Sequence, residues 1–146
     1  MNRVTLPATI LSGFALIAPN LGLAGEAQGG IAMELNQAQD AQSGGCQLTV
    51  VVENGSGLAL ARAAWQIAVF DTQGAVRALP VLDFGALAKD KTKVAMFVLP
   101  GATCASTARI VVNDVAECRV EGGENQPDLC LAGLKASTRT SIAFGL

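Results

Sequence analysis

The stretch Cys46-Gln-Leu-Thr-Val-Val-Val-Glu53 alternates apolar and polar residues, and Asn54-Gly-Ser-Gly57 follows it directly. Successive side chains of a β-strand point to opposite faces, so this alternation predicts a strand with one buried face. The residues expected on that face are Cys46, Leu48, Val50 and Val52. Asn and Gly tolerate the positive φ of tight turns, which predicts that the strand ends in a turn at Asn54–Gly57.

Similar short apolar segments recur along the chain, separated by Gly, Pro, Asn and Asp. The segments expected to be strands, besides the first, are Ile31–Leu35, Ala63–Phe70, Val76–Leu82, Lys91–Leu99, Ala108–Val115 and Ile142–Phe144. About seven short strands with turn signals every 8–12 residues are typical of a β-sandwich. We therefore predict an all-β, immunoglobulin-like antiparallel β-sandwich over residues 25–146 as a single domain, with a barrel and a mixed α+β fold as alternatives.

Local features refine this prediction. Asn36–Gly45 is polar and is expected to be a long loop, and Gly85–Asp90 a loop or a single helical turn. Pro80 lacks an N–H and makes Val76–Leu82 an edge strand. In Ala63–Phe70 the inward residues are Trp65, Ile67 and Val69. In Lys91–Leu99 they are Val94, Met96 and Val98.

Residues 1–24 have the features of an export signal. A positive Asn2-Arg3 precedes the apolar run Val4–Ala18, and Gly22-Leu-Ala24 offers small residues for cleavage. A membrane span needs about 20 apolar residues, and this run is shorter and is interrupted. We expect no stable membrane span after signal cleavage, with an uncleaved anchor as the alternative.

Four cysteines in an exported chain are expected to form disulfides. Cys118 and Cys130 flank Gly122-Gly123, which allows the chain to return, so we expect these two to pair. Cys46 and Cys104 are then partners by elimination. The two bridges would stabilise the fold by about 3 and about 4 kcal/mol in the loop-entropy description. A metal site or a redox centre fits less well, because no Cys-x-x-Cys occurs and the acids of the Cys118–Cys130 segment lack calcium-loop spacing.

The composition excludes several functions. The chain contains no histidine and no tyrosine, which excludes serine–histidine and cysteine–histidine catalysis. Its net charge of −2 argues against nucleic acid as a partner. Lys89, Lys91 and Lys93 form one small basic cluster, interpreted as a solvated loop leading into a strand.

Two alternatives to a purely structural role have named residues. Met33 and Met96 could bind copper(I), although both are better explained as core residues. Asp114, Glu117 and Asp128 are candidate carboxylates for a small hydrolase, which would require a cleft. Asn54-Gly-Ser56 also matches the N-glycosylation pattern, and turn chemistry explains it better.

Two resemblances add to this interpretation. Val51-Val-Glu-Asn-Gly-Ser-Gly57 with Ile67-Ala-Val-Phe-Asp-Thr-Gln-Gly74 resembles the FxLYD-type domain, which implies an extracytoplasmic immunoglobulin-like sandwich. Leu99-Pro-Gly101 with Cys104, and Arg109–Val115 before Cys118, resemble a family of uncharacterised small exported proteobacterial proteins, often labelled as carrying a twin-arginine signal. Asn2-Arg3 departs from a twin arginine, so the general secretory route is expected.

These observations predict a periplasmic or secreted, non-enzymatic binding or accessory module. We expect no catalytic, cofactor-binding or metal-binding residues, and no cofactor. An exposed strand, Ile31–Leu35 or Val76–Leu82, is expected to accept a protein partner by strand addition.

Overall fold

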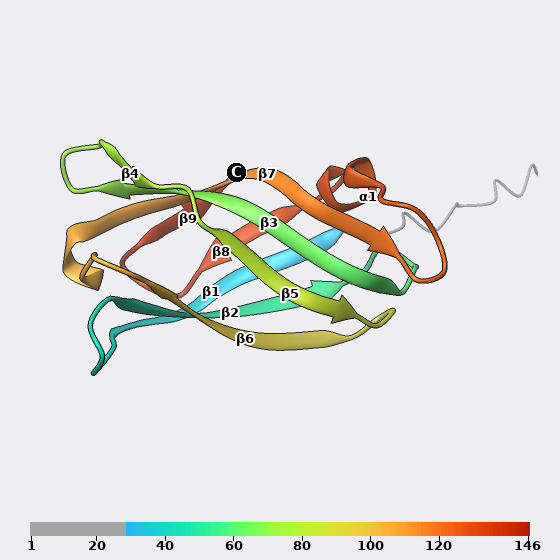
Figure 1. Cartoon of the computed structure of the whole chain (residues 1–146), viewed down its shortest axis with the longest axis horizontal. Helices are drawn as coiled ribbons and strands as arrows, with labels where there is room; N and C mark the ends of the chain where they lie inside the picture. Colours follow the sequence, from blue (N-terminus) through green and yellow to red (C-terminus); the bar gives the residue numbers. More distant parts are fainter. Residues whose placement is uncertain (1–28) are drawn as a thin grey trace, which may run out of the picture.

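The computed structural model describes residues 29–146, and the predicted signal peptide, residues 1–24, lies outside the described residues. Strands dominate the described chain (Figure 1). In chain order the elements are β1 (Ile31–Asp40), β2 (Cys46–Asn54), β3 (Leu60–Asp71), β4 (Val76–Ala78), β5 (Val81–Leu87), β6 (Thr92–Leu99), the 3-10 turn η1 (Cys104–Ser106), β7 (Thr107–Val120), α1 (Pro127–Leu131), β8 (Lys135–Thr138) and β9 (Ala143–Gly145).

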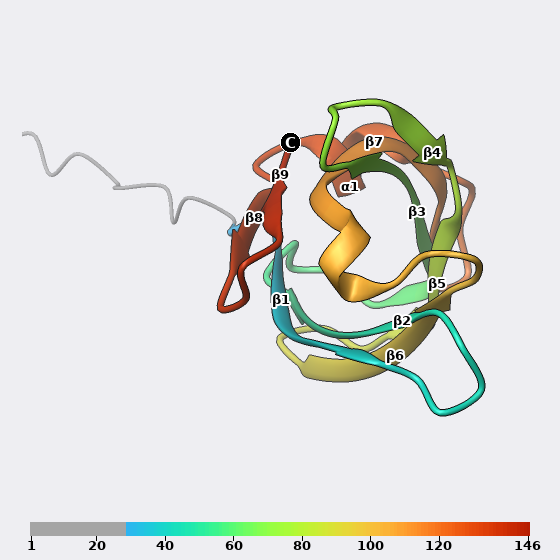
Figure 2. The same ribbon diagram turned by 90° about the vertical axis from the view of Figure 1, so that its left-hand side faces the viewer.

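The strands form two sheets, and the predicted all-β sandwich is confirmed. One sheet has the order β6-β2-β1-β8, and the other has β4-β3-β7-β9 with β5 also paired to β3. Most pairs are antiparallel, but β8 runs parallel to β1 and β9 parallel to β7. In the end view β8 and β9 lie together on one side of the sandwich, and β5 and β6 lie on the other (Figure 2).

The core lies between the inner faces of the two sheets. The predicted inward residues of β2 and β3 are all buried, with at most 2% of each residue exposed. Trp65 of β3 packs edge-on against Phe84 of β5, with ring centroids 5.7 Å apart, and Phe84 packs against Phe97 of β6 at 5.2 Å. These aromatic contacts join the two sheets on the β5–β6 side.

Both disulfides have the pairing expected from the sequence. Cys46 at the start of β2 bonds to Cys104 in η1, and Cys118 of β7 bonds to Cys130 in α1. The second bridge holds α1 over the core, where the Trp65 indole N–H donates to the Cys130 carbonyl at 3.4 Å. Two intramolecular disulfides are typical of proteins that are oxidised outside the cytosol.

The expectation that Ile31–Leu35 is an edge strand is wrong. β1 lies between β2 and β8 and is paired on both sides, because Lys135–Thr138 returns from the C-terminal end of the chain. The expected loop Asn36–Gly45 is wrong in its first half, since β1 continues to Asp40 after an irregularity between Leu35 and Gln37. Only the part after Asp40 forms the turn.

The segment Val76–Leu82 is two strands, not one. Pro80 separates β4 from β5, and its carbonyl accepts a hydrogen bond from the Ile67 N–H of β3 at 2.9 Å. β5 then runs on to Leu87, so the first half of the segment Gly85–Asp90, expected to be a loop or a helical turn, is strand. The prediction that this segment lies at a sheet edge is confirmed.

The inward face of β6 is the opposite of the one predicted. Val94, Met96 and Val98 are 61%, 68% and 47% exposed, whereas Leu99 is buried. Antiparallel pairing sets Met96 opposite Thr49, on the half-exposed outer face of β2, and Phe97 opposite the buried Leu48. The inward set contains the charged Lys93, whereas Val94, Met96 and Val98 are all apolar, so alternation pointed to the wrong face.

Asn54, which is fully buried, holds the turns at one end of the sandwich. Its side-chain amide donates to the carbonyls of Leu58 at 2.8 Å, Leu87 at 3.1 Å and Ala88 at 3.2 Å. Its Oδ1 accepts from the N–H and the hydroxyl of Ser56. This residue therefore joins the β2–β3 turn to the end of β5, just before β6 begins.

Candidate binding surface: the free edge of strand β6

The two sides of the sandwich differ in how their edge strands are covered. β8 and β9, consecutive in the chain, are the last strands of the two sheets on one side and are in contact with each other. On the other side β6 ends one sheet, and β4 and β5 end the other. No strand within residues 29–146 pairs with the outer edge of β6, which is therefore termed the free edge.

The backbone of the free edge can be assigned from one hydrogen bond. The Asn54 N–H donates to the carbonyl of Lys91, the residue directly opposite it in the β2–β6 register. Hydrogen-bonded pairs recur every second residue of an antiparallel ladder, so Lys93, Ala95 and Phe97 direct their amides toward β2. It follows that the N–H and C=O groups of Val94, Met96 and Val98 point outward from the sheet.

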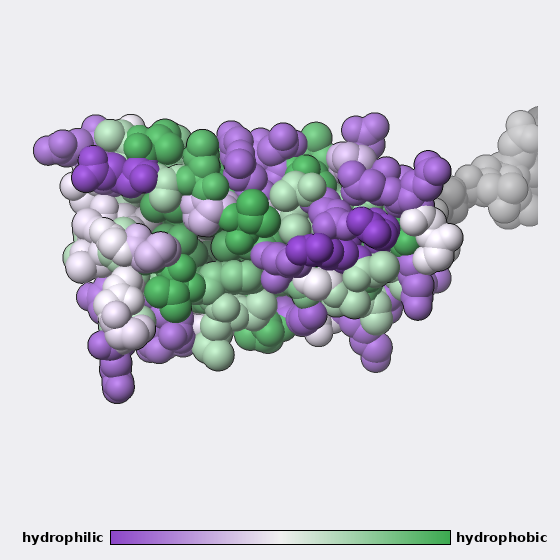
Figure 3. All heavy atoms as spheres, viewed as in Figure 1, coloured by the Kyte–Doolittle hydropathy of each residue, from purple (hydrophilic) through white to green (hydrophobic). Residues whose placement is uncertain are grey.

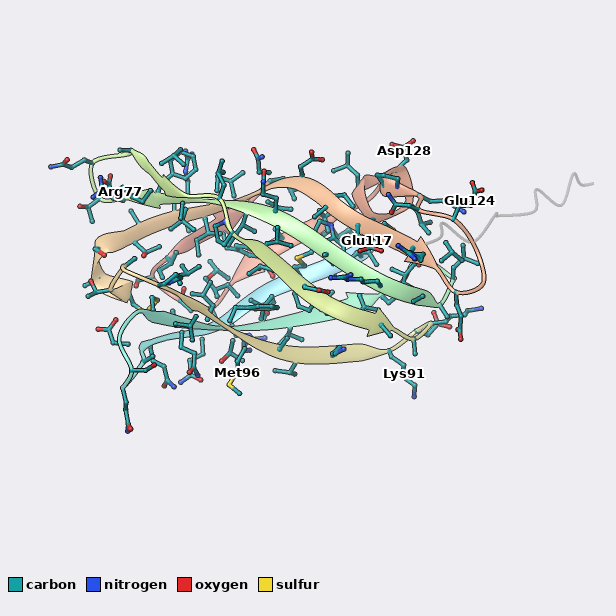
Figure 4. All side chains as sticks on the ribbon, in the orientation of Figure 1. Arg77, Lys91, Met96, Glu117, Glu124 and Asp128 are labelled. Atoms are coloured by element: carbon teal, nitrogen blue, oxygen red, sulfur yellow. A yellow bond between two sulfur atoms is a disulfide. The ribbon has the colours of Figure 1, made fainter. Side chains whose placement is uncertain are left out.

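The same three residues carry the exposed apolar side chains of β6. Figure 4 shows the Met96 side chain pointing away from the body of the protein, on the same lower rim as Lys91. In Figure 3 apolar side chains gather over the middle and left of this face, and hydrophilic ones lie toward the right, where β6 begins. An edge strand with outward amides and exposed apolar side chains can pair with another extended chain.

The neighbouring edge of β5 is partly covered. The Lys93 ammonium donates to the carbonyls of Phe84 and Ala86 on β5, the latter at 3.2 Å. These hydrogen bonds occupy two carbonyls of β5 and turn the Lys93 side chain away from the outward amides of β6. Of the strands that end the sheets on this side, β6 is the longest, with eight residues against seven in β5 and three in β4.

The candidate hydrolase carboxylates are not brought together. Glu117 forms ion pairs with Arg119 at 2.6 Å and with Arg62 at 3.3 Å. Asp114 accepts a hydrogen bond from the Val115 N–H, and Asp128 lies on α1 (Figure 4). The arrangement offers no pair of carboxylates facing one cleft, which the hydrolase alternative requires.

The ion pairs around Glu117 extend across the outer face of the second sheet. Arg62 of β3 donates to Asp83 of β5 at 2.6 Å, and this hydrogen bond holds the pKa of the Asp83 carboxyl below its ordinary value. Asp83 in turn raises the pKa of Arg62. Both side chains are well exposed, at 53% for Arg62 and 40% for Asp83, so the pair contributes little to stability.

The candidate copper ligands lie on opposite faces of one sheet. Met33 is 1% exposed on the inner face of β1, which confirms its prediction as a core residue. Met96 is on the outer face of β6, and the Gln47 amide donates to its sulfur at 3.4 Å. Because the sheet separates the two thioethers, they cannot bind one ion together. The described residues contain no group of three or more Cys, Asp or Glu able to hold a metal.

The N-glycosylation pattern at Asn54 has a structural explanation. The side chain is 0% exposed and both its amide and its carbonyl make hydrogen bonds within the fold. A glycan cannot be attached to this nitrogen in the folded protein. The interpretation as turn chemistry is therefore confirmed.

Residues 29–146 form a disulfide-bonded, all-β sandwich in which no strand covers the outer edge of β6. Within residues 29–146 no helix has the length and apolar character that a membrane crossing requires. Comparison of the chain with protein-family models, with curated proteins and with solved structures finds no match. The free edge of β6 could not be found from sequence, because Val94, Met96 and Val98 were assigned to the core.

Proposed function

We propose that this protein is an exported, non-enzymatic binding or accessory module that holds an extended segment of a partner polypeptide against β6. One observation supports this proposal. The same three residues, Val94, Met96 and Val98, have outward N–H and C=O groups and exposed apolar side chains. The partner's backbone would supply the affinity through main-chain hydrogen bonds. The protein is periplasmic or secreted in this proposal, in keeping with its disulfides.

The energetics are those of a modest binding site. Covering side chains that are now about half exposed would contribute about 1 kcal/mol each. Net contributions of about 1 kcal/mol are also typical of each new hydrogen bond. Ordering the partner segment opposes both gains. A moderate affinity follows, which suits an accessory protein with reversible contacts.

A photo-crosslinking amino acid at Met96, in the protein expressed and exported in cells, tests the proposal. The control places the crosslinker at Gln73, which is exposed in the β3–β4 turn. Discrete adducts are expected from position 96 and not from position 73. The adducts should disappear when Val94→Pro is added, because its N–H points outward and proline then blocks strand addition without breaking the β2–β6 ladder. Adducts that persist in the Val94→Pro protein would overturn strand addition as the mode of binding.

A further inference from the structure

The free edge has chemically different ends. Lys91 and Lys93 stand where β6 begins, and Leu99 and Pro100 stand where it ends. A segment lying along β6 would therefore meet positive charge at one end and an apolar surface at the other.

The apolar end is hollowed. A depression of about 500 Å³ lies between the β4–β5 connection and the end of β6, and its lining includes Leu79, Pro80, Leu99 and Pro100. Arg77 also lines it, but this guanidinium is paired with Asp71 at 3.5 Å, so most of the surface that remains is apolar. Leu79 is 53% exposed. If a strand were bound along β6, a side chain near Leu99 that points toward the sheet containing β4 and β5 would enter the depression.

The charged end is open to an anion. Lys91 is exposed, and the ion pairs found within residues 29–146 involve neither Lys91 nor Lys93. The Lys93 ammonium makes two hydrogen bonds to β5 carbonyls and has three N–H donors, so one donor remains for a carboxylate. The acids nearest to these lysines are Asp90, directly before Lys91, and Glu53, opposite Thr92, and neither forms an ion pair with them, while Asp83 is paired with Arg62. The two ammonium groups therefore still favour an acidic residue on the occupant.

We infer that the occupant of the free edge is an extended polypeptide segment with an acidic residue beside Lys91 and Lys93 and an apolar side chain in the depression beside Leu99. This inference rests on the proposed function and specifies the chemistry of the partner. It applies to either direction of the bound strand, because both lysines and the depression are fixed on β6.

A second copy of the chain fits this site less well. A twofold antiparallel pairing that uses all the outward amides places Met96 opposite Met96 and Lys93 opposite Leu99. Each lysine would then lie at the apolar depression of its partner, and no carboxylate would meet the lysines. A different polypeptide of acidic and apolar character satisfies both ends.

The test uses the oxidised protein, residues 25–146, and synthetic peptides with a fluorescent label. Each peptide is about nine residues long with alternating Val and Thr, a length and pattern suited to a strand. One pair of peptides carries two Asp at the N-terminal or the C-terminal end, and a matched pair carries two Lys. Binding is measured by anisotropy at low salt, and the contact is mapped from the backbone amide resonances of β6.

At least one acidic peptide should bind about five- to tenfold more tightly than its lysine counterpart, with shifts at Val94, Met96 and Val98. The preference should fall as salt is added. Lys91→Glu should abolish or reverse it, whereas Lys135→Glu, on β8 at the other end of the sheet order, should leave it unchanged. Leu79→Gln, an exposed position, should weaken every peptide that binds.

The remaining outcomes separate the inference from the proposed function. Equal binding of acidic and basic peptides at β6 would overturn the inference and leave strand addition standing. No peptide binding up to about 1 mM, an affinity of only about 4 kcal/mol, would overturn both. A dimer in solution that Met96→Pro converts to monomer would identify a second copy as the occupant and overturn the inference.

Discussion

Replacing Asn54 with alanine should destabilise the fold far more than a polar substitution in a turn usually does. The side chain donates to three carbonyls and accepts from two Ser56 donors, and it is fully buried. Removing it leaves these groups without their partner, and each buried unsatisfied group costs about 1–3 kcal/mol. The carbonyls of Leu58 and Ala88 belong to exposed residues and can recover water. The buried Leu87 carbonyl and the Ser56 N–H cannot, and the Ser56 hydroxyl keeps only its longer hydrogen bond to the Leu58 carbonyl, at 3.3 Å.

The expected loss is therefore about 3 kcal/mol of the free energy of unfolding, which is a large share of the 5–15 kcal/mol typical of a domain. Urea denaturation of the oxidised protein measures it as a shift of the midpoint at constant slope. Ser56→Ala removes one hydroxyl and should cost about 1 kcal/mol. Asn36→Ala is the matched control, because that exposed side chain donates only to Glu34, and it should cost under about 0.5 kcal/mol.

A loss below about 1 kcal/mol for Asn54→Ala would refute the reasoning, since it would mean that water replaces the side chain. The result also bears on the binding surface. The Asn54 N–H and carbonyl hold Lys91 and Asp90 at the start of β6. The amides of this turn should therefore lose protection from hydrogen exchange in the Asn54→Ala protein before those of β3 do.

Three further predictions concern other parts of the molecule. Mild peroxide should oxidise Met96 and spare Met33 in the native protein, because the Met96 thioether is exposed and the Met33 thioether is in the core. Peptide mass spectrometry measures this difference, and equal oxidation of the two residues would contradict the orientation of β6. Replacing both cysteines of the Cys118–Cys130 bridge with alanine should lower the free energy of unfolding by about 3 kcal/mol in urea denaturation, and an unchanged midpoint would show that α1 adds nothing to the fold. Because the pKa of Asp83 is lowered in the folded protein, its stabilisation is present above the unfolded pKa of about 3.9 and is lost as pH falls through the folded pKa. The difference in unfolding free energy between the native protein and Asp83→Asn should therefore be largest near neutral pH and vanish in acid; a difference that grows in acid would contradict this sign.

The central strands could be predicted from the sequence because their two faces differ. In β2, Gln47, Thr49 and Glu53 mark the outer face, and period-two alternation then assigns the inner one. In β3 the same argument places Trp65 in the core. Local pattern was sufficient to assign the inner face of both strands, although Ala64 and Ala68 on the other face of β3 are buried as well.

The edges of the sheets could not be predicted in this way. β1 is internal only because β8, more than 90 residues later, pairs with it in parallel, and no local signal reports such a distant partner. In β6 the residue that misleads is Lys93, a charged side chain on the inner face. Its long stem reaches past the core to the carbonyls of β5, so a polar residue on the inner face is tolerated there.

The two resemblances stated from the sequence stay predictions, since neither has support from the comparisons. The proposed binding surface depends on neither resemblance. It follows from strand order, from one backbone hydrogen bond that fixes the direction of the amides, and from the exposure of three side chains.

Residue-resolved hydrogen exchange of β6, with and without a bound acidic peptide, tests the central claim most directly. In the protein alone the amides of Val94, Met96 and Val98 should exchange rapidly, while those of Ala95 and Phe97, bonded to β2, should exchange slowly. Bound peptide should slow the first group to the rate of the second. Slow exchange at all five positions without a partner, or peptide binding that leaves the outward amides fast, would contradict the account.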